Sequence, residues 1–177
     1  MNSYKEDIAL AVNGDCDAFA RLYAVIYKEL YAFALYSLRN EADAQDAVSD
    51  AVIDAFAGIK RLRDEQAFKA WFFRILSAKI KRKQKEYANM PQYVENSDDI
   101  AAICSEFESI ELQQAMKLLG EEERLVLSLS AIGGYKSKEI AKMCKMKDAT
   151  VRSKISRAKQ KLANILQIDE RSALNET

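Results

Sequence analysis

The sequence contains no histidine, a single proline and only five glycines among its 177 residues. Without histidine, the chain lacks the side chain that most often serves as a general base or a metal ligand, which argues against an enzyme. The scarcity of glycine and proline leaves few residues suited to the tight turns between β-strands, whereas helix formers such as Ala, Leu, Glu and Lys are abundant. The composition therefore predicts an all-α protein.

Cysteine is also scarce, because Cys16, Cys104 and Cys144 are too few and too far apart for a disulfide framework or a Cys-rich metal site. No apolar stretch approaches the roughly 20 residues of a membrane-spanning helix. No basic segment leads into an apolar one at the start, and Gly-rich phosphate loops and nucleophile motifs are absent. We therefore expect a cytoplasmic protein with no membrane insertion, metal, cofactor or small-molecule substrate.

The charged residues are segregated along the chain, although 27 basic and 27 acidic side chains cancel in sum. Residues 60–88 hold ten basic and three acidic side chains, and residues 136–161 hold ten basic and two acidic ones. The remainder then carries 7 basic and 22 acidic side chains. Basic blocks commonly bind a polyanion because each neutralised phosphate releases counterions, but Lys-rich helix faces also occur as solvated surfaces.

Apolar residues recur at helical spacing in three segments of the first half and four of the second. These segments are 17–39, 42–57, 65–87, 107–119, 121–132, 137–144 and 148–167. Asp17 is expected to cap the first helix. Because Pro91 and acidic, hydrophilic residues interrupt the pattern, we expect two small helical domains, 1–90 and 107–177, joined by a flexible acidic linker at 91–106.

The second domain is expected to hold four helices and to end in a helix-turn-helix. Gly133 and Gly134 close one helix, Ser137 is placed to cap the next, and a short turn leads to Asp148, which is expected to cap the last. In that last helix the apolar side chains share one face, which must be turned toward the core: Val151, Ile155, Ala158, Leu162 and Ile165.

The opposite face of the last helix suits the major groove of DNA, because short polar side chains can reach base edges while longer cations reach phosphates. The candidate DNA-contacting residues are Arg152, Ser153, Lys154, Ser156, Arg157 and Gln160. A solvated basic helix covering a small bundle is the alternative. The absence of any acidic residue from 149 to 167 favours DNA contact.

Four aspartates, Asp43, Asp46, Asp50 and Asp54, lie on one face of the second predicted helix. Like charges at this spacing destabilise an isolated helix by roughly 0.2 to 0.5 kcal/mol per pair, which a basic partner surface would offset. An ordinary solvated acidic face is the alternative. A metal site is not expected, because carboxylates on a regular helix do not converge.

The third helix is aromatic at its start and basic toward its end. Phe68, Phe72 and Ile75 are expected to join the core, whereas Trp71 and Phe73 cannot both do so. Aromatic rings interleaved with Lys and Arg suit single-stranded nucleic acid, whose bases stack on rings while cations follow the backbone. Core packing remains the alternative for each of these rings.

In this order the features resemble an extracytoplasmic-function (ECF) sigma factor of bacterial RNA polymerase, of the sigma-70 family. The matching segments are Ala18–Tyr23, Asp43–Phe56, Ala67–Ile75, Lys138–Ala141 and Thr150–Ala158. The resemblance implies a sigma-2 domain over 1–90, which docks on the β′ clamp and holds the minus-10 element. It also implies a sigma-4 domain over 107–177, which contacts the β flap and reads the minus-35 element. An anti-sigma factor is a further implied partner.

The resemblance assigns roles to three groups of residues. Polymerase binding falls to Asp43, Asp46 and Asp50; minus-10 binding to Lys60, Arg61, Trp71 and Arg74; and minus-35 binding to the exposed face of the last helix. The chain also departs from the family, since Ala78 and Arg82 stand where Asn and Asp are usual, and Phe56 where Trp is frequent.

The sequence therefore predicts a factor that directs core polymerase to promoters and assists their melting, with no catalytic activity of its own. A free-standing helix-turn-helix regulator, which would bind duplex DNA without polymerase, is the alternative. The acidic helix followed by an aromatic and basic helix argues against that alternative.

Overall fold

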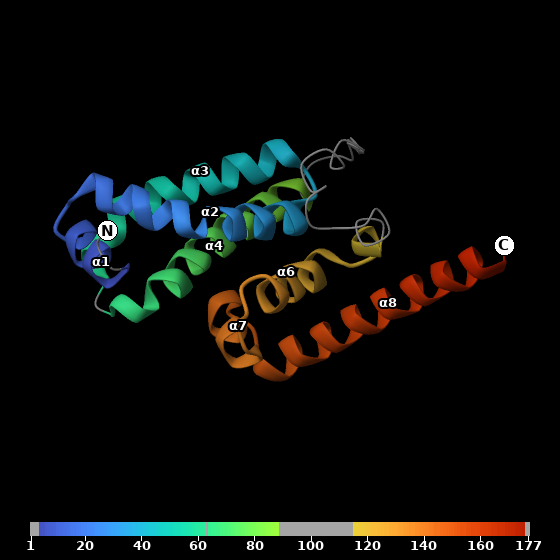
Figure 1. Cartoon of the computed structure of the whole chain (residues 1–177). Coiled ribbons are helices and arrows are strands. Elements are labelled where there is room, and N and C mark those ends of the chain that lie inside the picture. The colour runs from blue at the N-terminus through green and yellow to red at the C-terminus, as the bar shows by residue number, and fades with distance from the viewer. Residues whose placement is uncertain (1–3, 63, 89–114, 176–177) are drawn as a thin grey trace.

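The computed structural model describes residues 4–62, 64–88 and 115–175, and every regular element within these ranges is a helix (Figure 1). The first half contains α1 (Tyr4–Val12), α2 (Cys16–Leu38), α3 (Glu41–Gly58) and α4 (Phe68–Ala88). Two short 3-10 turns, η1 (Ile59–Arg61) and η2 (Glu65–Ala67), lie between α3 and α4. The second half contains α6 (Glu121–Ala131), α7 (Ser137–Cys144) and α8 (Asp148–Asn175). The all-α prediction is confirmed.

The predicted helices match α2, α3, α4, α6 and α7 closely, and α8 extends eight residues beyond its predicted end at 167. The predicted linker at 91–106 lies outside the described residues, as does most of the helix predicted at 107–119, of which 115–117 are helical. The sequence interpretation missed α1. This helix has only nine residues, so its stability comes from burying Ile8 and Ala11 and from an ion pair of 2.6 Å between Asp7 and Arg21 of α2.

Three predicted helix caps are wrong by one or two residues. The carboxylate that caps α2 is that of Asp15, which accepts from the Ala18 backbone N–H at 2.9 Å, while Asp17 lies inside the first turn. At α7 the capping position is Lys136, whose backbone N–H donates to the Glu139 carboxylate at 2.8 Å. Asp148, the expected cap of α8, is instead the first residue of that helix.

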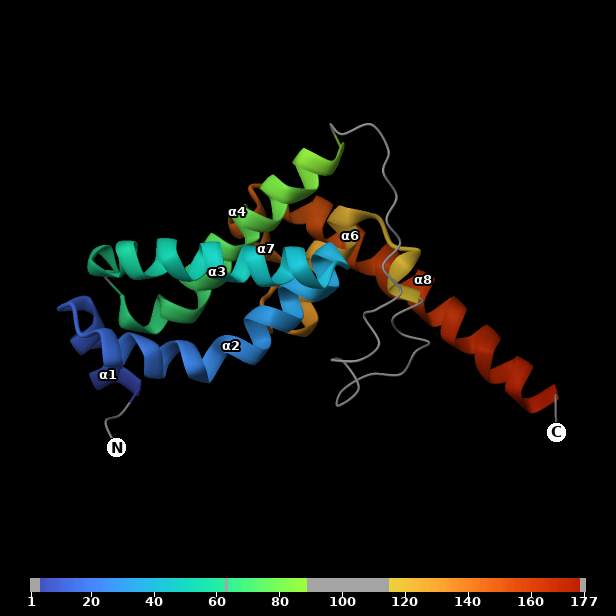
Figure 2. The same ribbon diagram turned by 90° about the horizontal axis from the view of Figure 1, so that it is seen from above.

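Helices α2, α3 and α4 lie side by side, with α1 across one end of α2 (Figures 1 and 2). The inner face of α3 is a stripe of fully buried alanines, Ala44, Ala47, Ala51 and Ala55. These short side chains let the α3 backbone approach both neighbours closely. On the outer side of this layer, α6 packs on α2 and α7 packs on α4.

The two halves share one apolar core. Phe73 of α4 is fully buried, and its ring lies 5.4 Å from the ring of Phe33 in α2 and 5.4 Å from that of Tyr135, which precedes α7. Leu125 of α6 and Ile140 of α7 are buried in the same cluster. Phe68 and Phe72 are buried as predicted, whereas Trp71 stays partly exposed. The helix-turn-helix is thus held against α2 and α4.

Replacing Phe73 by alanine should lower the free energy of unfolding by about 3 to 5 kcal/mol, because the cavity would open where three elements meet. Urea unfolding followed by circular dichroism measures this loss. The matched control is Val25→Ala on the exposed side of α2, which should change stability by about 0.5 kcal/mol or less. A loss under about 1 kcal/mol for Phe73→Ala would contradict the shared core.

Candidate functional site: the nucleic-acid and polymerase surfaces

Helix α8 presents the predicted DNA-contacting face to solvent. Val151 and Ala158 are fully buried on its inner side. The exposed side carries Arg152, Ser153, Ser156, Arg157 and Gln160. The Ser153 hydroxyl donates to the Thr150 carbonyl at 3.0 Å, and Arg157 Nε donates to the Ser153 carbonyl at 3.4 Å. Arg157 makes no ion pair with any described residue, so its guanidinium is available to a ligand.

Lys154 lies on a different side of α8 from the other candidates. Its ammonium pairs with Glu122 of α6 at 2.8 Å, and Lys161 pairs in the same way with Glu123 at 2.7 Å. The hydrogen bond from Lys161 lowers the pKa of Glu123, against the opposing effect of burial. These two ion pairs hold α8 against α6, so Lys154 is less available to DNA than the sequence pattern suggested.

Further cations lie on α7 and on the turn before α8. They are exposed and make no ion pair with any residue in the described ranges: Lys138, Lys142, Lys145 and Lys147. The sequence interpretation counted them in the basic block but did not place them in the site. In a helix-turn-helix the first helix lies across the DNA backbone. Unpaired lysines there are consistent with phosphate contacts.

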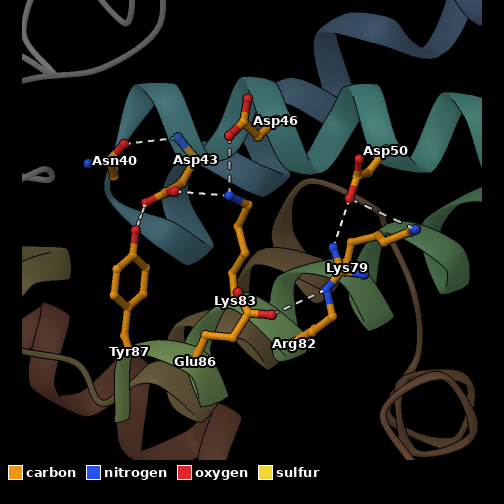
Figure 3. A network of polar contacts seen from close by, with 9 residues as sticks. All are labelled: Asn40, Asp43, Asp46, Asp50, Lys79, Arg82, Lys83, Glu86 and Tyr87. Atoms are coloured by element: carbon orange, nitrogen blue, oxygen red, sulfur yellow. Dashed lines mark hydrogen bonds and ion pairs between the residues drawn. The ribbon is translucent and has the colours of Figure 1, made fainter. Parts of the chain in front are cut away.

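The acidic row of α3 faces the basic side of α4 (Figure 3). Lys83 pairs with Asp43 at 3.0 Å and with Asp46 at 3.4 Å. Arg82 pairs with Asp50 at 2.8 Å. The basic partner that the sequence pattern requires is therefore present within the chain itself.

The four aspartates differ in exposure and in bonding. The Asp43 side chain is only 13% exposed, and it accepts hydrogen bonds from Lys83 and from the Tyr87 hydroxyl. The hydrogen bond from the Tyr87 hydroxyl to Asp43 and the nearby carboxylates raise the pKa of Tyr87 to about 12. The Asp46 side chain is 73% exposed. Asp43 thus joins α3 to α4, while Asp46 is open to a partner.

The outer face of α3 also carries two apolar side chains, of which the sequence interpretation noted only Phe56, as a departure from the family pattern. Ile53 is 66% exposed, and Phe56 is 45% exposed while its ring packs edge-on against Phe19 at 5.2 Å. Their positions opposite the alanine stripe are a sequence signal that could have found them. Neighbouring exposed apolar side chains with a rim of polar groups are typical of a protein-binding surface.

The predicted minus-10 residues gather where α3 leads into α4. Lys60 and Arg61 are exposed in η1, and Arg74 is exposed on α4. The Trp71 ring packs beside Gly58, so closely that a Cβ at Gly58 would lie 3.3 Å from it. This contact places the partly exposed indole next to the cations of η1.

The described residues contain no group of three or more Cys, Asp or Glu side chains that could hold a metal ion. Cys16 is exposed and Cys144 is buried in α7, where burial raises the pKa of its thiol. Among the described helices, none is both long enough and apolar enough to cross a membrane.

Comparison with known proteins agrees with this arrangement. Residues 22–87 match the family model described as Sigma-70 region 2, and residues 109–162 match that of Sigma-70, region 4. The chain is 30% identical over 166 residues to the ECF RNA polymerase sigma factor SigM of Mycobacterium tuberculosis, covering 93% of this chain and 85% of that protein. It is 29% identical over 175 residues to the ECF RNA polymerase sigma-E factor of Escherichia coli K12, covering 87% and 89%.

Two solved structures share the fold. CnrH in complex with the cytosolic domain of CnrY has a TM-score of 0.66 at 24% identity, covering 95% of this chain and 99% of that chain. The sigma factor RpoE of Bartonella quintana, in complex with the anti-sigma factor NepR, has a TM-score of 0.67 at 21% identity, covering 85% and 98%.

The chain belongs to the sigma-70 family of RNA polymerase sigma factors, and within it to the extracytoplasmic-function group. It is therefore a transcription initiation factor that directs RNA polymerase to specific promoters. The resemblance inferred from the sequence is confirmed.

Replacing Asp43 by alanine should lower the free energy of unfolding by about 1 to 3 kcal/mol, because Lys83 and Tyr87 would lose their shared acceptor. Asp46→Ala, on the same face and far more exposed, should cost about 0.5 kcal/mol or less. Urea unfolding of the two variants measures the difference. Equal losses would contradict the distinction between the two aspartates.

Proposed function

We propose that the outer face of α3 docks on core RNA polymerase, at the β′ clamp. Ile53 and Asp46 support this assignment, because they combine a largely exposed apolar side chain with a largely exposed carboxylate on one helix. Such a surface fits a partner helix that carries apolar and basic side chains. Asp50 is shared between this surface and α4, and Asp43 supports α3 from the α4 side.

The region where α3 meets α4 is proposed to hold the melted minus-10 element. Lys60, Arg61 and Arg74 are exposed and make no ion pair with a described residue, and the partly exposed Trp71 ring lies beside η1. Free cations next to an aromatic ring can follow a single-stranded backbone while a base stacks. Ala78, one turn beyond Arg74, offers no polar group, so Arg74 is the polar contact in this part of α4.

Helix α8 is proposed to read the minus-35 element in the major groove. The observation that carries this assignment is the orientation of α8, with Val151 and Ala158 buried and Ser153, Arg157 and Gln160 turned outward. Arg can bond the O6 and N7 atoms of guanine, and short polar side chains can reach other base edges. Arg152 and Ser156 flank this strip, and Lys154 contributes least because Glu122 holds it.

The chain is proposed to act in the cytoplasm, without catalytic activity, as two functional units over 1–90 and 107–177. A second expected partner is an anti-sigma factor, which would keep the chain from polymerase until a signal releases it. The structural relatives support this proposal, since one of them is a sigma factor bound to the anti-sigma factor NepR. Contact of residues 107–177 with the β flap completes the proposed polymerase interface.

Ile53→Asp should weaken binding to core polymerase by on the order of tenfold or more, because it places a charge in the centre of the docking face. Val25→Asp is a matched control, since Val25 is 67% exposed against 66% for Ile53 but lies on α2. Titration of labelled chain with purified core polymerase measures both affinities. If the two variants bind equally well, α3 is not the docking face.

Arg157→Ala should reduce promoter binding by the holoenzyme by about 1 to 3 kcal/mol and relax its discrimination at the minus-35 element. Lys154→Ala should have a smaller effect, because Glu122 already occupies that ammonium. Run-off transcription from a promoter that the wild-type holoenzyme uses, with its minus-35 element intact or scrambled, provides the comparison. A variant that still distinguishes the two templates as wild type does would refute the role of Arg157.

A further inference from the structure

The ion pairs between α3 and α4 differ in how open they are to solvent. The Lys83–Asp43 pair is largely buried, with side chains 16% and 13% exposed. Arg82 and Asp50 form the open pair, with side chains 56% and 43% exposed and a separation of 2.8 Å. Exposed ion pairs contribute little to stability, because water and salt screen the two charges. A competing ion can therefore replace either partner at little cost, while the Lys83 pair keeps the helices together.

Arg82 also belongs to the proposed nucleic-acid side of α4. It lies eight residues after Arg74, and both side chains are exposed, as is that of Lys85. These residues form a cationic strip that leads away from the turn between α3 and α4. Arg82 therefore has two possible anionic partners, the Asp50 carboxylate and a phosphate. Glu86 is a weaker third neighbour, 3.5 Å away.

Asp50 likewise has two possible cationic partners. It is half-open at the edge of the proposed docking face, one turn from the exposed Asp46. Lys79 lies 4.0 Å from Asp50, but it pairs more closely with Asp54 at 2.6 Å. Arg82 is therefore the main internal neighbour that a basic side chain of a docked protein would displace.

We propose that the Asp50–Arg82 pair is an exchange switch, in which a basic polymerase side chain takes Asp50 and releases Arg82 to the phosphate backbone of single-stranded promoter DNA. This inference rests on the proposed docking and minus-10 roles. The two binding events are then coupled. By thermodynamic linkage, DNA bound at Arg82 favours polymerase at Asp50 to the same degree. The chain thus carries in Arg82 a cation that is masked until the factor has docked.

The test measures binding of the full chain, without polymerase, to a fluorescein-labelled single-stranded oligonucleotide across a salt series. Asp50→Asn removes the carboxylate charge that pairs with Arg82 and should tighten binding several-fold. It should also steepen the plot of log K against log salt by about 0.7, the value expected for one additional phosphate contact. The matched control is Glu41→Gln, which removes the same charge from α3 at a residue whose carboxylate accepts from Gln45 and makes no ion pair with any residue that the structure describes.

The double variant Asp50→Asn with Arg82→Ala should lose both the gain in affinity and the steeper slope, while Arg82→Ala alone should change little. Thermal melting confirms that each variant is folded. The proposal fails if Asp50→Asn and Glu41→Gln give equal slopes, if the gain persists without Arg82, or if no variant binds the oligonucleotide. A separate titration with core polymerase tests the docking role. Failure of the docking role can therefore be told apart from failure of the exchange switch.

Discussion

The pairing of the acidic helix α3 with the basic helix α4 determines which charged side chains of these two helices remain available to a partner. Neither α3 nor α4 is favourable alone, because each lines up like charges along one side. Packed together, the two helices largely bury the ion pair between Asp43 and Lys83 and leave Asp46 and Arg74 exposed. The alanine stripe of α3 makes this pairing possible, since a larger inner face would hold the helices too far apart for the ion pairs to form.

This pairing also gives meaning to the zero net charge of the chain. A substantial part of the basic block at 60–88 forms ion pairs with the chain's own carboxylates. Lys154 and Lys161 likewise pair with carboxylates of α6. Among the residues that the structure describes, the cations that make no ion pair are concentrated at η1, the outer side of α4, α7 and the outer side of α8. A protein with no excess of positive charge can thus still offer localised positive surfaces to DNA, while its affinity for DNA in general stays low.

Periodicity in the sequence predicted the long helices well, because each has an unbroken apolar stripe. It missed α1, whose nine residues depend on an ion pair with Arg21, fourteen residues further on. It identified α8 and its outer face, but the direction of Lys154 depends on where Glu122 of another helix lies. It noted that a basic partner surface would offset the repulsion within the aspartate row, yet no local rule shows that α4 supplies that surface. Contacts between distant segments decided each of these points, including the position of Arg82 beside Asp50.

The shared core around Phe73 has a consequence for dissecting the protein. Because Leu125 and Ile140 are buried against α2 and α4, a cut anywhere between residues 88 and 115 would produce two fragments that each lose apolar cover. The isolated helix-turn-helix fragment would then tend to self-associate, and it would report poorly on the DNA affinity of the intact chain. The isolated halves, although convenient to express, would therefore differ in exposed apolar surface and in behaviour from the same halves within the intact chain.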